Sequence, residues 1–186
     1  MQDNLTPLGA IYQWEKTRPD VVHFVQPTGG GQVQTYTWAE LMDQVRRMAA
    51  HLQSLNLPAG SNIALLGKNS AHWIMADYAI WMAGYTSVPL YPTLNADTVE
   101  YILEHSEAKA IFVGKLDDWD MMRPGVSDEL PMIELPLAPA TRGDKWEDLI
   151  QRQQPLQGEP DRDLDDTATI VYTSGSTGKP KGVVLT

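Results

Sequence analysis

"SNIALLGKNSAHWIMADYAIWMAGYTSVPLY", residues 61–91, decides the fold. Its segments 62–67 and 86–91 are short apolar runs of strand length. Between them, Ser70 is placed to cap a helix over 71–83, and Gly84 is placed to close it. A strand, a helix and a second apolar strand in this order are typical of a βαβ unit.

The same alternation continues downstream of this unit. "ADTVEYILEHS" at 96–106 predicts a helix that begins after Asn95, and "AKAIFVG" at 108–114 predicts another apolar strand. Strands that are apolar on both faces and separated by helices are typical of a parallel sheet with right-handed crossovers. We therefore expect an α/β fold, with a mostly parallel sheet and helices on both of its faces.

The flanking segments extend the pattern. "TWAELMDQVRRMAAHLQSLNL" at 37–57 has capping-box spacing at Thr37 and Glu40 and an apolar face at intervals of three and four. The glycine-rich turn 27–31 predicts a hairpin of the strand candidates on either side of it. The other expected elements are a helix within 7–20, a strand at 131–135, a helix at 145–153, a solvated acidic linker at 155–166, and strands at 167–173 and 182–186.

Composition narrows the setting. The 186 residues are 42% hydrophobic, which suits one folded domain, and the formal net charge of -10 disfavours general binding to nucleic acid. The absence of cysteine excludes a disulfide framework and a thiolate metal site. Neither a leader peptide nor a membrane-spanning run is recognisable, so we expect a cytoplasmic protein and leave peripheral contact with a membrane surface open.

A second informative stretch is "YTSGSTGKPKGVVLT", residues 172–186. It differs from a Walker A loop because Thr173 stands where the first glycine should be and Pro180 follows Lys179. A Walker A loop also leads into a helix, whereas the β-branched residues at 183–184 favour a strand. The stretch is therefore expected to connect two strands.

The composition of this loop fits a polyphosphate ligand. Glycines let backbone amides turn toward a common point, and the surrounding hydroxyls and lysines add hydrogen-bond donors. Each charge-assisted hydrogen bond contributes about 1.5–3 kcal/mol when it is desolvated. A polar hairpin turn is the plain alternative, although such a turn needs one glycine and no lysine. The candidate phosphate-binding residues are Thr173, Ser174, Gly175, Ser176, Thr177, Gly178, Lys179 and Lys181.

The loop closely resembles the glycine-rich phosphate loop of the adenylate-forming (AMP-binding) superfamily. This superfamily includes acyl-CoA synthetases, adenylation domains of peptide synthetases and luciferases. The likeness extends upstream, in the family's order and spacing, through residues 35–52, 60–94 and 96–113, and it is loose over 115–165. Within the superfamily the chain looks most like the long-chain fatty acyl-CoA synthetases, with enzymes for medium-chain or aryl acids next.

The resemblance implies a two-step acid-thiol ligase that uses ATP, Mg²⁺ and coenzyme A. In such enzymes a carboxylate, here that of a fatty acid, attacks the α-phosphorus of MgATP and gives an acyl-adenylate and pyrophosphate. A thiol then attacks the acyl carbon to give the thioester and AMP. The loop would close over the β- and γ-phosphates, with hydroxyls from its serines and threonines, amides from its glycines and charge from Lys179 and Lys181.

The resemblance also implies that much of the enzyme lies elsewhere. The family segments that bind adenine, ribose, the α-phosphate, magnesium and the acyl group follow this loop, as does a small C-terminal domain with a catalytic lysine. Residues 1–186 are therefore expected to be an N-terminal portion of the large domain, without catalytic or metal-binding residues. We expect the chain alone to be inactive, to bind MgATP weakly, and to self-associate through exposed sheet edge or apolar surface.

Two other functions stay open at this point. One is an adenylation domain that serves a carrier protein instead of CoA, and the other is a non-catalytic module that binds a nucleotide or phosphate. The histidines lack the spacing of metal ligands and are interpreted as surface or packing residues. They are His23, His51, His72 and His105.

Overall fold

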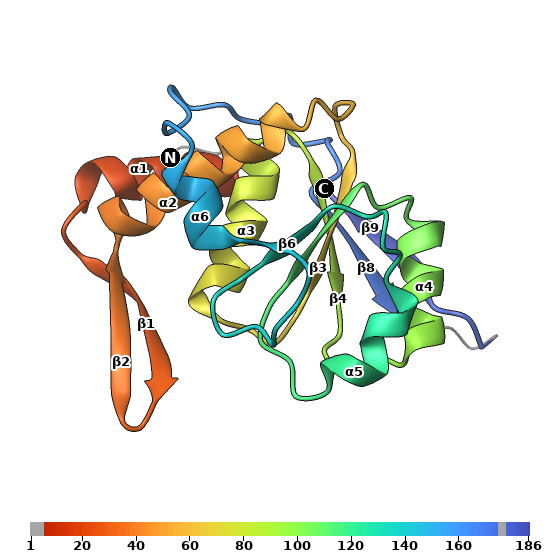
Figure 1. Cartoon of the computed structure of the whole chain (residues 1–186). Helices are drawn as coiled ribbons and strands as arrows, with labels where there is room; N and C mark the ends of the chain where they lie inside the picture. Colours follow the sequence, from red (N-terminus) through yellow and green to blue (C-terminus); the bar gives the residue numbers. More distant parts are fainter. Residues whose placement is uncertain (1–5, 175–177) are drawn as a thin grey trace.

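The computed structural model describes residues 6–174 and 178–186. Among these residues the frame is a seven-stranded sheet in the order β7-β6-β5-β3-β4-β8-β9. Its neighbouring strands are parallel, except that β9 runs antiparallel to β8. Figure 1 shows the sheet with helices on either side. The expected α/β fold with a mostly parallel sheet is confirmed.

The predicted βαβ units form the centre of this sheet. Strand β3 (Asn62–Leu66) pairs with β4 (Thr86–Leu90) on one side and with β5 (Ala110–Val113) on the other. From Ile63 to Leu66 the side chains have 0% exposure. A strand that is covered on both faces has no polar side to alternate with, which explains its continuous apolar sequence.

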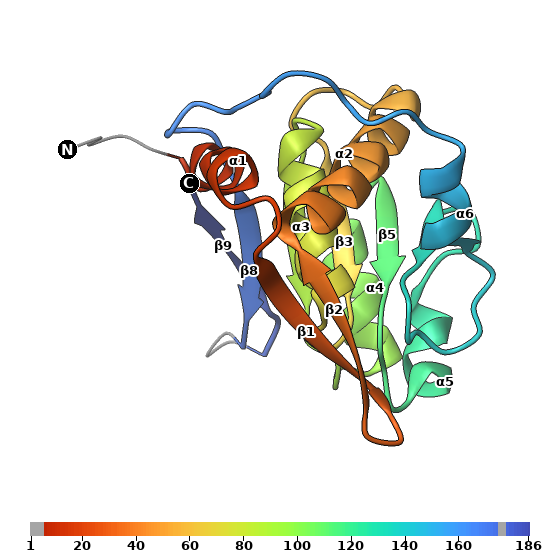
Figure 2. The same ribbon diagram turned by 90° about the vertical axis from the view of Figure 1, so that its left-hand side faces the viewer.

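Two groups of helices cover the two faces, as Figures 1 and 2 show. Ile63 and Leu65 of β3 point into the core formed by the first group, and Ala64 and Leu66 point into the core formed by the second. The first group consists of α1 (Pro7–Thr17), α2 (Trp38–Ser54), α3 (Ala71–Met82) and α6 (Trp146–Gln151). The second group consists of α4 (Ala96–His105) and α5 (Trp119–Met122).

The predicted helix starts are also confirmed. Thr37 and Glu40 form a reciprocal capping box at the start of α2. Ser70 caps α3 by accepting a backbone N–H with its hydroxyl, and Asn95 caps α4 with its side-chain oxygen. Each cap satisfies a backbone donor that has no partner within the first helical turn, so these polar residues fix where the helices begin.

The predicted hairpin forms a small sheet of its own. Strands β1 (Val22–Gly29) and β2 (Gln32–Thr37) are antiparallel and project from the body of the molecule in both views (Figures 1 and 2). Gly29, Gly30 and Gly31 have φ angles of 102°, 58° and 77°. Consecutive positive φ angles favour glycine, which accounts for the glycine run at the turn.

The acidic segment 155–166 is solvated, as its composition predicts, but hydrogen bonds also anchor its backbone. The Arg46 guanidinium donates to the backbone carbonyls of Leu156 at 3.0 Å and of Gly158 at 2.7 Å. The Tyr12 hydroxyl donates to the carbonyl of Pro160 at 2.7 Å. The segment is mostly exposed, but its backbone is fastened to α1 and α2.

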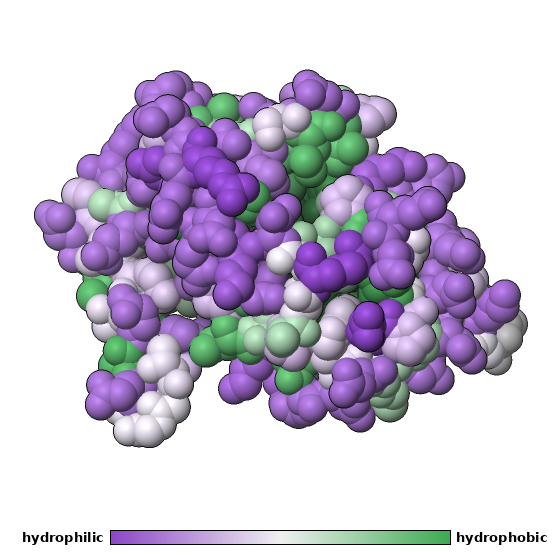
Figure 3. All heavy atoms as spheres, in the orientation of Figure 1, coloured by the Kyte–Doolittle hydropathy of each residue, from purple (hydrophilic) through white to green (hydrophobic). Residues whose placement is uncertain are grey.

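The remaining strands lie at the two sides of the sheet. Strands β6 (Met132–Glu134) and β7 (Asp144–Lys145) form one side, and β8 (Thr169–Thr173) and β9 (Lys181–Leu185) form the other. The face in Figure 3 is mainly hydrophilic with separate hydrophobic patches, in keeping with the net charge of -10. In the described part of the chain, no helix is long and apolar enough to cross a membrane.

Candidate functional site

The predicted phosphate loop connects two strands, as its sequence suggested. Thr173 is the last residue of β8, Lys181 is the first residue of β9, and the two are partners in the antiparallel register. The loop leaves β8 at the carboxyl end, which is the same edge of the sheet at which β4 ends. In α/β folds, ligands bind at this edge. Gly175, Ser176 and Thr177 lie outside the described residues.

A hollow of about 610 Å³ opens beside the loop. One wall is the loop itself, through Thr173, Ser174, Gly178 and Pro180. The opposite wall comes from the end of β4, the connection that follows it and the face of α4. Those wall residues are Pro89, Leu90, Tyr91, Thr93, Leu94, Thr98 and Ile102, and Tyr172 lines the hollow from β8.

The described loop residues present polar groups to solvent. Thr173, Ser174, Lys179 and Lys181 are exposed, and neither lysine forms an ion pair with a carboxylate among residues 6–174 and 178–186. Gly178 has a φ of 91°, a conformation that side chains rarely adopt. The described part of the loop therefore offers hydroxyls, a turned backbone and two cations that form no ion pair with a carboxylate of the described residues.

The glycine in β9 has a different role from those in the loop. A Cβ at Gly182 would lie 2.9 Å from Cγ2 of Ile170 and 3.3 Å from Cζ of Tyr172. Both neighbours belong to β8, which pairs with β9. Gly182 is thus needed for close packing under the Tyr172 ring, rather than for access to a phosphate.

Two residues of α4 touch the flanks of the loop. Nδ1 of His105 and the hydroxyl of Tyr172 share a hydrogen bond of 2.7 Å. Nζ of Lys179 lies 5.0 Å from the centroid of the Tyr101 ring. The sequence interpretation placed His105 among the surface or packing residues and did not consider Tyr101. Their spacing of four residues on a helix was the available signal, because it puts both on one face.

Two of the other histidines, His72 and His23, pack against neighbouring residues. His72 is 6% exposed, and burial lowers its pKa to about 4. His23 stacks on Trp38 with ring centroids 3.8 Å apart. Among the described residues, no three His, Asp or Glu side chains are grouped to hold a metal ion.

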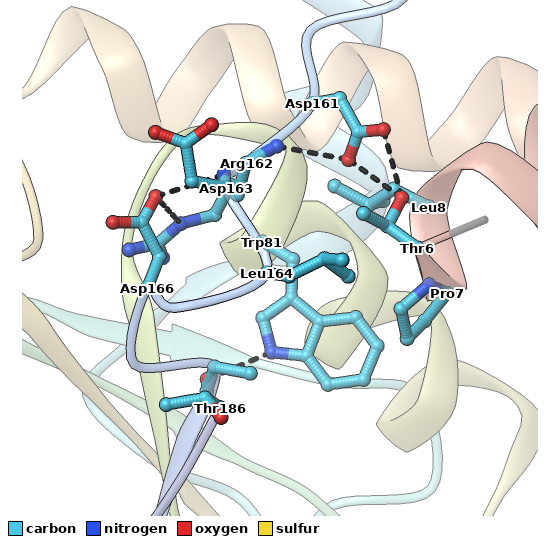
Figure 4. Close-up of a pocket in the computed structure, with 11 residues that line it drawn as sticks. Thr6, Pro7, Leu8, Trp81, Asp161, Arg162, Asp163, Leu164, Asp166 and Thr186 are labelled. Carbon is cyan, nitrogen blue, oxygen red and sulfur yellow. Dashed lines mark hydrogen bonds and ion pairs between the residues drawn. The ribbon is translucent and has the colours of Figure 1, made fainter. Parts of the chain in front are cut away.

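A second, smaller hollow of about 130 Å³ lies at the other end of β8 (Figure 4). Trp81 lines it and donates its indole N–H to the carbonyl of Ala168 at 2.9 Å. Several polar groups around it contact one another, since Thr6 donates to Asp161 at 2.8 Å and Arg162 lies 3.4 Å from Asp166. This arrangement fastens the acidic segment to α1 and leaves the phosphate loop as the better candidate site.

Comparison with known proteins identifies the family of the chain. The family model described as "AMP-binding enzyme" matches residues 11–186. The long-chain-fatty-acid–CoA ligase FadD15 of Mycobacterium tuberculosis is 30% identical over 99% of this chain and 31% of that protein. The peroxisomal long chain acyl-CoA synthetase 6 of Arabidopsis thaliana is 33% identical over 84% of this chain and 24% of that protein. The probable CoA ligase CCL6 of Humulus lupulus is 34% identical over 81% and 25%.

Solved structures show the same fold. The anthranilate CoA ligase AuaEII, in complex with anthranoyl-AMP, aligns with a TM-score of 0.81 and 20% identity over 95% of this chain and 34% of that chain. The N-terminal subdomain of Klebsiella oxytoca NpsA aligns with a TM-score of 0.68 and 24% identity over 96% and 42%. The chain spans 24–31% of the length of the curated relatives named above. The family match over residues 11–186, the relatives and the fold agree that the chain belongs to the AMP-binding enzyme family.

Proposed function

We propose that this chain is the N-terminal part of an ATP-dependent acyl-CoA synthetase, an acid-thiol ligase that acts on a long-chain fatty acid. The observation that carries the proposal is the loop 173–181, which opens at the carboxyl ends of β4 and β8 with both lysines exposed. Two relatives whose names specify long-chain substrates support the acyl group, at 30% and 33% identity. Their names also favour CoA over a carrier protein as the acceptor.

In this proposal the loop binds the β- and γ-phosphates of MgATP. Negative charge accumulates on the departing pyrophosphate while the fatty carboxylate attacks the α-phosphorus. Donors placed around that charge stabilise the transition state more than the ground state. The donors are the hydroxyls of Thr173, Ser174, Ser176 and Thr177, the amides of Gly175 and Gly178, and the ammonium groups of Lys179 and Lys181.

The later parts of the reaction need residues outside this chain. The described residues hold no cluster of metal ligands, so we propose that Mg²⁺ comes with the nucleotide. The sites for adenine, the acyl group and CoA are likewise proposed to be formed by residues outside this chain. The chain alone is therefore proposed to be inactive, and the formation of acyl-adenylate from ATP and a fatty acid by the isolated chain would contradict this.

The phosphate role can be tested on the chain itself by titrating it with inorganic pyrophosphate and following its backbone amide signals by NMR. This method suits weak binding, which is expected because the loop contacts only the phosphate tail and must lose conformational freedom. The Thr173, Ser174 and Gly178 amides should shift. Lys181→Ala should weaken binding by about tenfold or more. Lys145→Ala removes an exposed lysine on β7, at the opposite side of the sheet, and should have no effect.

The outcome that would overturn the phosphate role is equally defined. Two results would contradict it: pyrophosphate perturbs only residues away from the loop's edge of the sheet, or it binds equally well to Lys181→Ala and to the unmodified chain. Either result would show that the lysine charge does not meet the ligand. The non-catalytic module would then lose its support as well, because it depends on the same loop.

The exposed edge of the sheet supports a further part of the proposal, which is self-association of the chain. Val183, Val184 and Leu185 of β9 are 44%, 57% and 47% exposed. An edge strand presents unpaired backbone groups, and here it adds apolar side chains on both faces. A second copy of the chain could cover both features at once.

A further inference from the structure

The two flanks of the phosphate loop are held by one face of α4. Tyr101 and His105 are four residues apart on this helix, so their side chains lie one above the other. Their ring centroids are 5.3 Å apart. His105 bonds to the hydroxyl of Tyr172, directly before the loop's first hydroxyl residue, and Tyr101 lies under Lys179 on the far side of the loop.

The contact at the first flank is well defined. The Tyr172 ring is 4% exposed and belongs to the core between α4 and the sheet. Burial raises the pKa of its hydroxyl, which therefore stays protonated and can donate. The His105 ring stands perpendicular to the Tyr172 ring, with centroids 5.7 Å apart. A buried ring with its only polar atom bonded to α4 leaves the end of β8 little freedom to shift.

The contact at the second flank is a cation over an aromatic face. Nζ of Lys179 lies 5.0 Å from the Tyr101 centroid, within the range at which the ring quadrupole attracts an ammonium group. Lys179 is exposed, and among the described residues it pairs with no carboxylate. An aromatic face holds a cation without neutralising its charge, so Lys179 remains available to an anion.

We propose that Tyr101 and His105 are positioning residues for the phosphate loop: Tyr101 holds the Lys179 ammonium at the mouth of the loop, and His105 fixes the end of β8 through Tyr172. This inference rests on the proposed function of the loop. Neither residue touches the ligand. Each lowers the conformational freedom that the loop must lose when it binds a polyphosphate, because the flanks are already in place.

The first test uses the chain without ligand. The ε-methylene protons of Lys179 should show an upfield NMR shift caused by the Tyr101 ring. Tyr101→Phe keeps the ring and should keep this shift, whereas Tyr101→Leu should abolish it. An unshifted Lys179 signal in the unmodified chain would overturn the inference, whatever the loop binds.

The second test is a double-mutant cycle with inorganic pyrophosphate as the probe. Tyr101→Leu and Lys179→Met should each weaken binding, Tyr101→Leu by about two- to fivefold. The double variant should bind no more weakly than Lys179→Met alone, since the ring acts through the lysine. Equal weakening by Tyr101→Leu in the presence and absence of the lysine would overturn the role assigned to Tyr101.

The His105 contact is tested with a matched pair of variants. His105→Gln retains a hydrogen-bonding group for Tyr172 and should bind pyrophosphate nearly as the unmodified chain does. His105→Leu removes that group and should weaken binding, although His105 is exposed and its loss leaves the fold in place. Weakening by both variants to the same extent would contradict the positioning role.

The two levels of the proposal can be told apart. If the unmodified chain binds no pyrophosphate, the proposed function of the loop fails and the inference fails with it. If the unmodified chain binds pyrophosphate and Tyr101→Leu and His105→Leu bind it equally well, the inference alone fails. Thermal unfolding of each variant checks that the fold is intact. Because Lys179 is exposed, Lys179→Met tests the same contact from the side of the lysine without disturbing the core.

Discussion

The centre of the sheet and its β8–β9 side are built from similar residues but have opposite surroundings. Leu65 in β3 and Phe112 in β5 have 0% exposure, whereas Val184 in β9 is 57% exposed. Helices cover the central strands on both faces, whereas within residues 6–174 and 178–186 β9 pairs with β8 alone. An apolar sequence alone therefore does not distinguish a strand of the buried core from an exposed edge strand that a partner could cover.

The difference also separates the region that we expect to govern stability from the proposed phosphate site. The central strands contribute packing, and their sequence can be explained without any ligand. The phosphate loop leaves from β8, at the open side of the sheet, and its flanks are fixed by α4 rather than by the sheet's centre. We therefore expect substitutions at the centre to have large effects on the free energy of unfolding and small effects on ligand binding. Substitutions at the β8–β9 side should have small effects on stability and larger effects on binding.

The largest effect is expected from Phe112→Ala at the centre of the sheet. Phe112 is fully buried and lies against Trp146, with ring centroids 6.2 Å apart. Removing its ring should lower the free energy of unfolding by about 3–5 kcal/mol, because buried surface is lost and a cavity remains. Urea denaturation followed by circular dichroism measures this change.

The matched control for that prediction is Val184→Ala on β9. Because Val184 is largely exposed, its truncation should change the free energy of unfolding by no more than about 0.5 kcal/mol. Similar losses in the two variants would show that the β8–β9 side contributes to folding as much as the centre does. The contrast between the two regions would then be wrong.

The next effect in size is acid destabilisation through His72, which lies in the core on the α3 side of the sheet. Its ring stands edge-on to Tyr36 and to Trp146, with centroids 5.4 Å away in each case. Burial lowers its pKa to about 4, below the ordinary value of 6.5. As the pH falls, the His72 ring is therefore protonated in the unfolded chain before it is protonated in the folded chain. The stabilising contribution of neutral His72 is fully present above pH 6.5 and is lost as the pH drops toward 4.

The expected loss is about 3 kcal/mol at most. His72→Phe keeps a ring between the same aromatic neighbours, and Gln44 still accepts the Trp146 indole N–H at 3.0 Å. Urea denaturation at pH 7 and at pH 4.5 should give a smaller difference for the variant than for the unmodified chain. If the variant and the unmodified chain lose equal stability between pH 7 and pH 4.5, His72 has the same pKa in the folded and unfolded states.

The centre of the sheet could be predicted from the sequence because its signals are local. The apolar run around Leu65 and the caps at Ser70 and Asn95 each lie within a few residues of the element they specify. The connection of two strands by the loop was predictable for the same reason, since its glycines and the β-branched residues after it are close together in the sequence. Short elements such as α5 and β7 gave no periodic pattern and were missed.

The supports of the site could not be predicted because they join residues distant in sequence. Tyr172 and His105 are 67 positions apart, and Arg46 and Leu156 are 110 apart. Each of these residues is unremarkable in its own segment. Only the pairing of β8 beside β4, which places α4 next to the loop, brings the first pair together.

A smaller stability effect is expected at Asp77, on the face of α3 nearest to β4. Burial raises the pKa of this carboxyl to about 6, and the Ser87 side chain opposes this increase to a lesser extent. Ser87 is paired with Ile63 at the centre and with Thr169 at the edge, so Asp77 lies where the two regions meet. Protonation stabilises the folded state, and this contribution is lost as the pH rises through 6.

Asp77→Asn should therefore raise the free energy of unfolding by about 1–2 kcal/mol at pH 8, and this gain should disappear toward pH 4. Urea denaturation across this pH range measures it. Asp165→Asn, at an exposed carboxylate in the acidic segment, should give no comparable gain. A gain of equal size at pH 4 and pH 8 would show that burial of the Asp77 charge is not its cause.

The smallest stability effect, and the sharpest test of the open edge, is expected from Val184→Lys on β9. This substitution should change the free energy of unfolding by less than about 0.5 kcal/mol, because the side chain is exposed. A charge on an edge strand opposes pairing with a second chain, so self-association should fall.

Val25→Lys is the matched control, since Val25 on the hairpin is 59% exposed and Val184 is 57% exposed. Sedimentation velocity should show species heavier than 20.7 kDa for the unmodified chain and for Val25→Lys, and mainly monomer for Val184→Lys. A monomeric unmodified chain at all concentrations would mean that exposed valines on β9 do not suffice to recruit a partner, and the two regions would then differ in burial without differing in their capacity to bind protein.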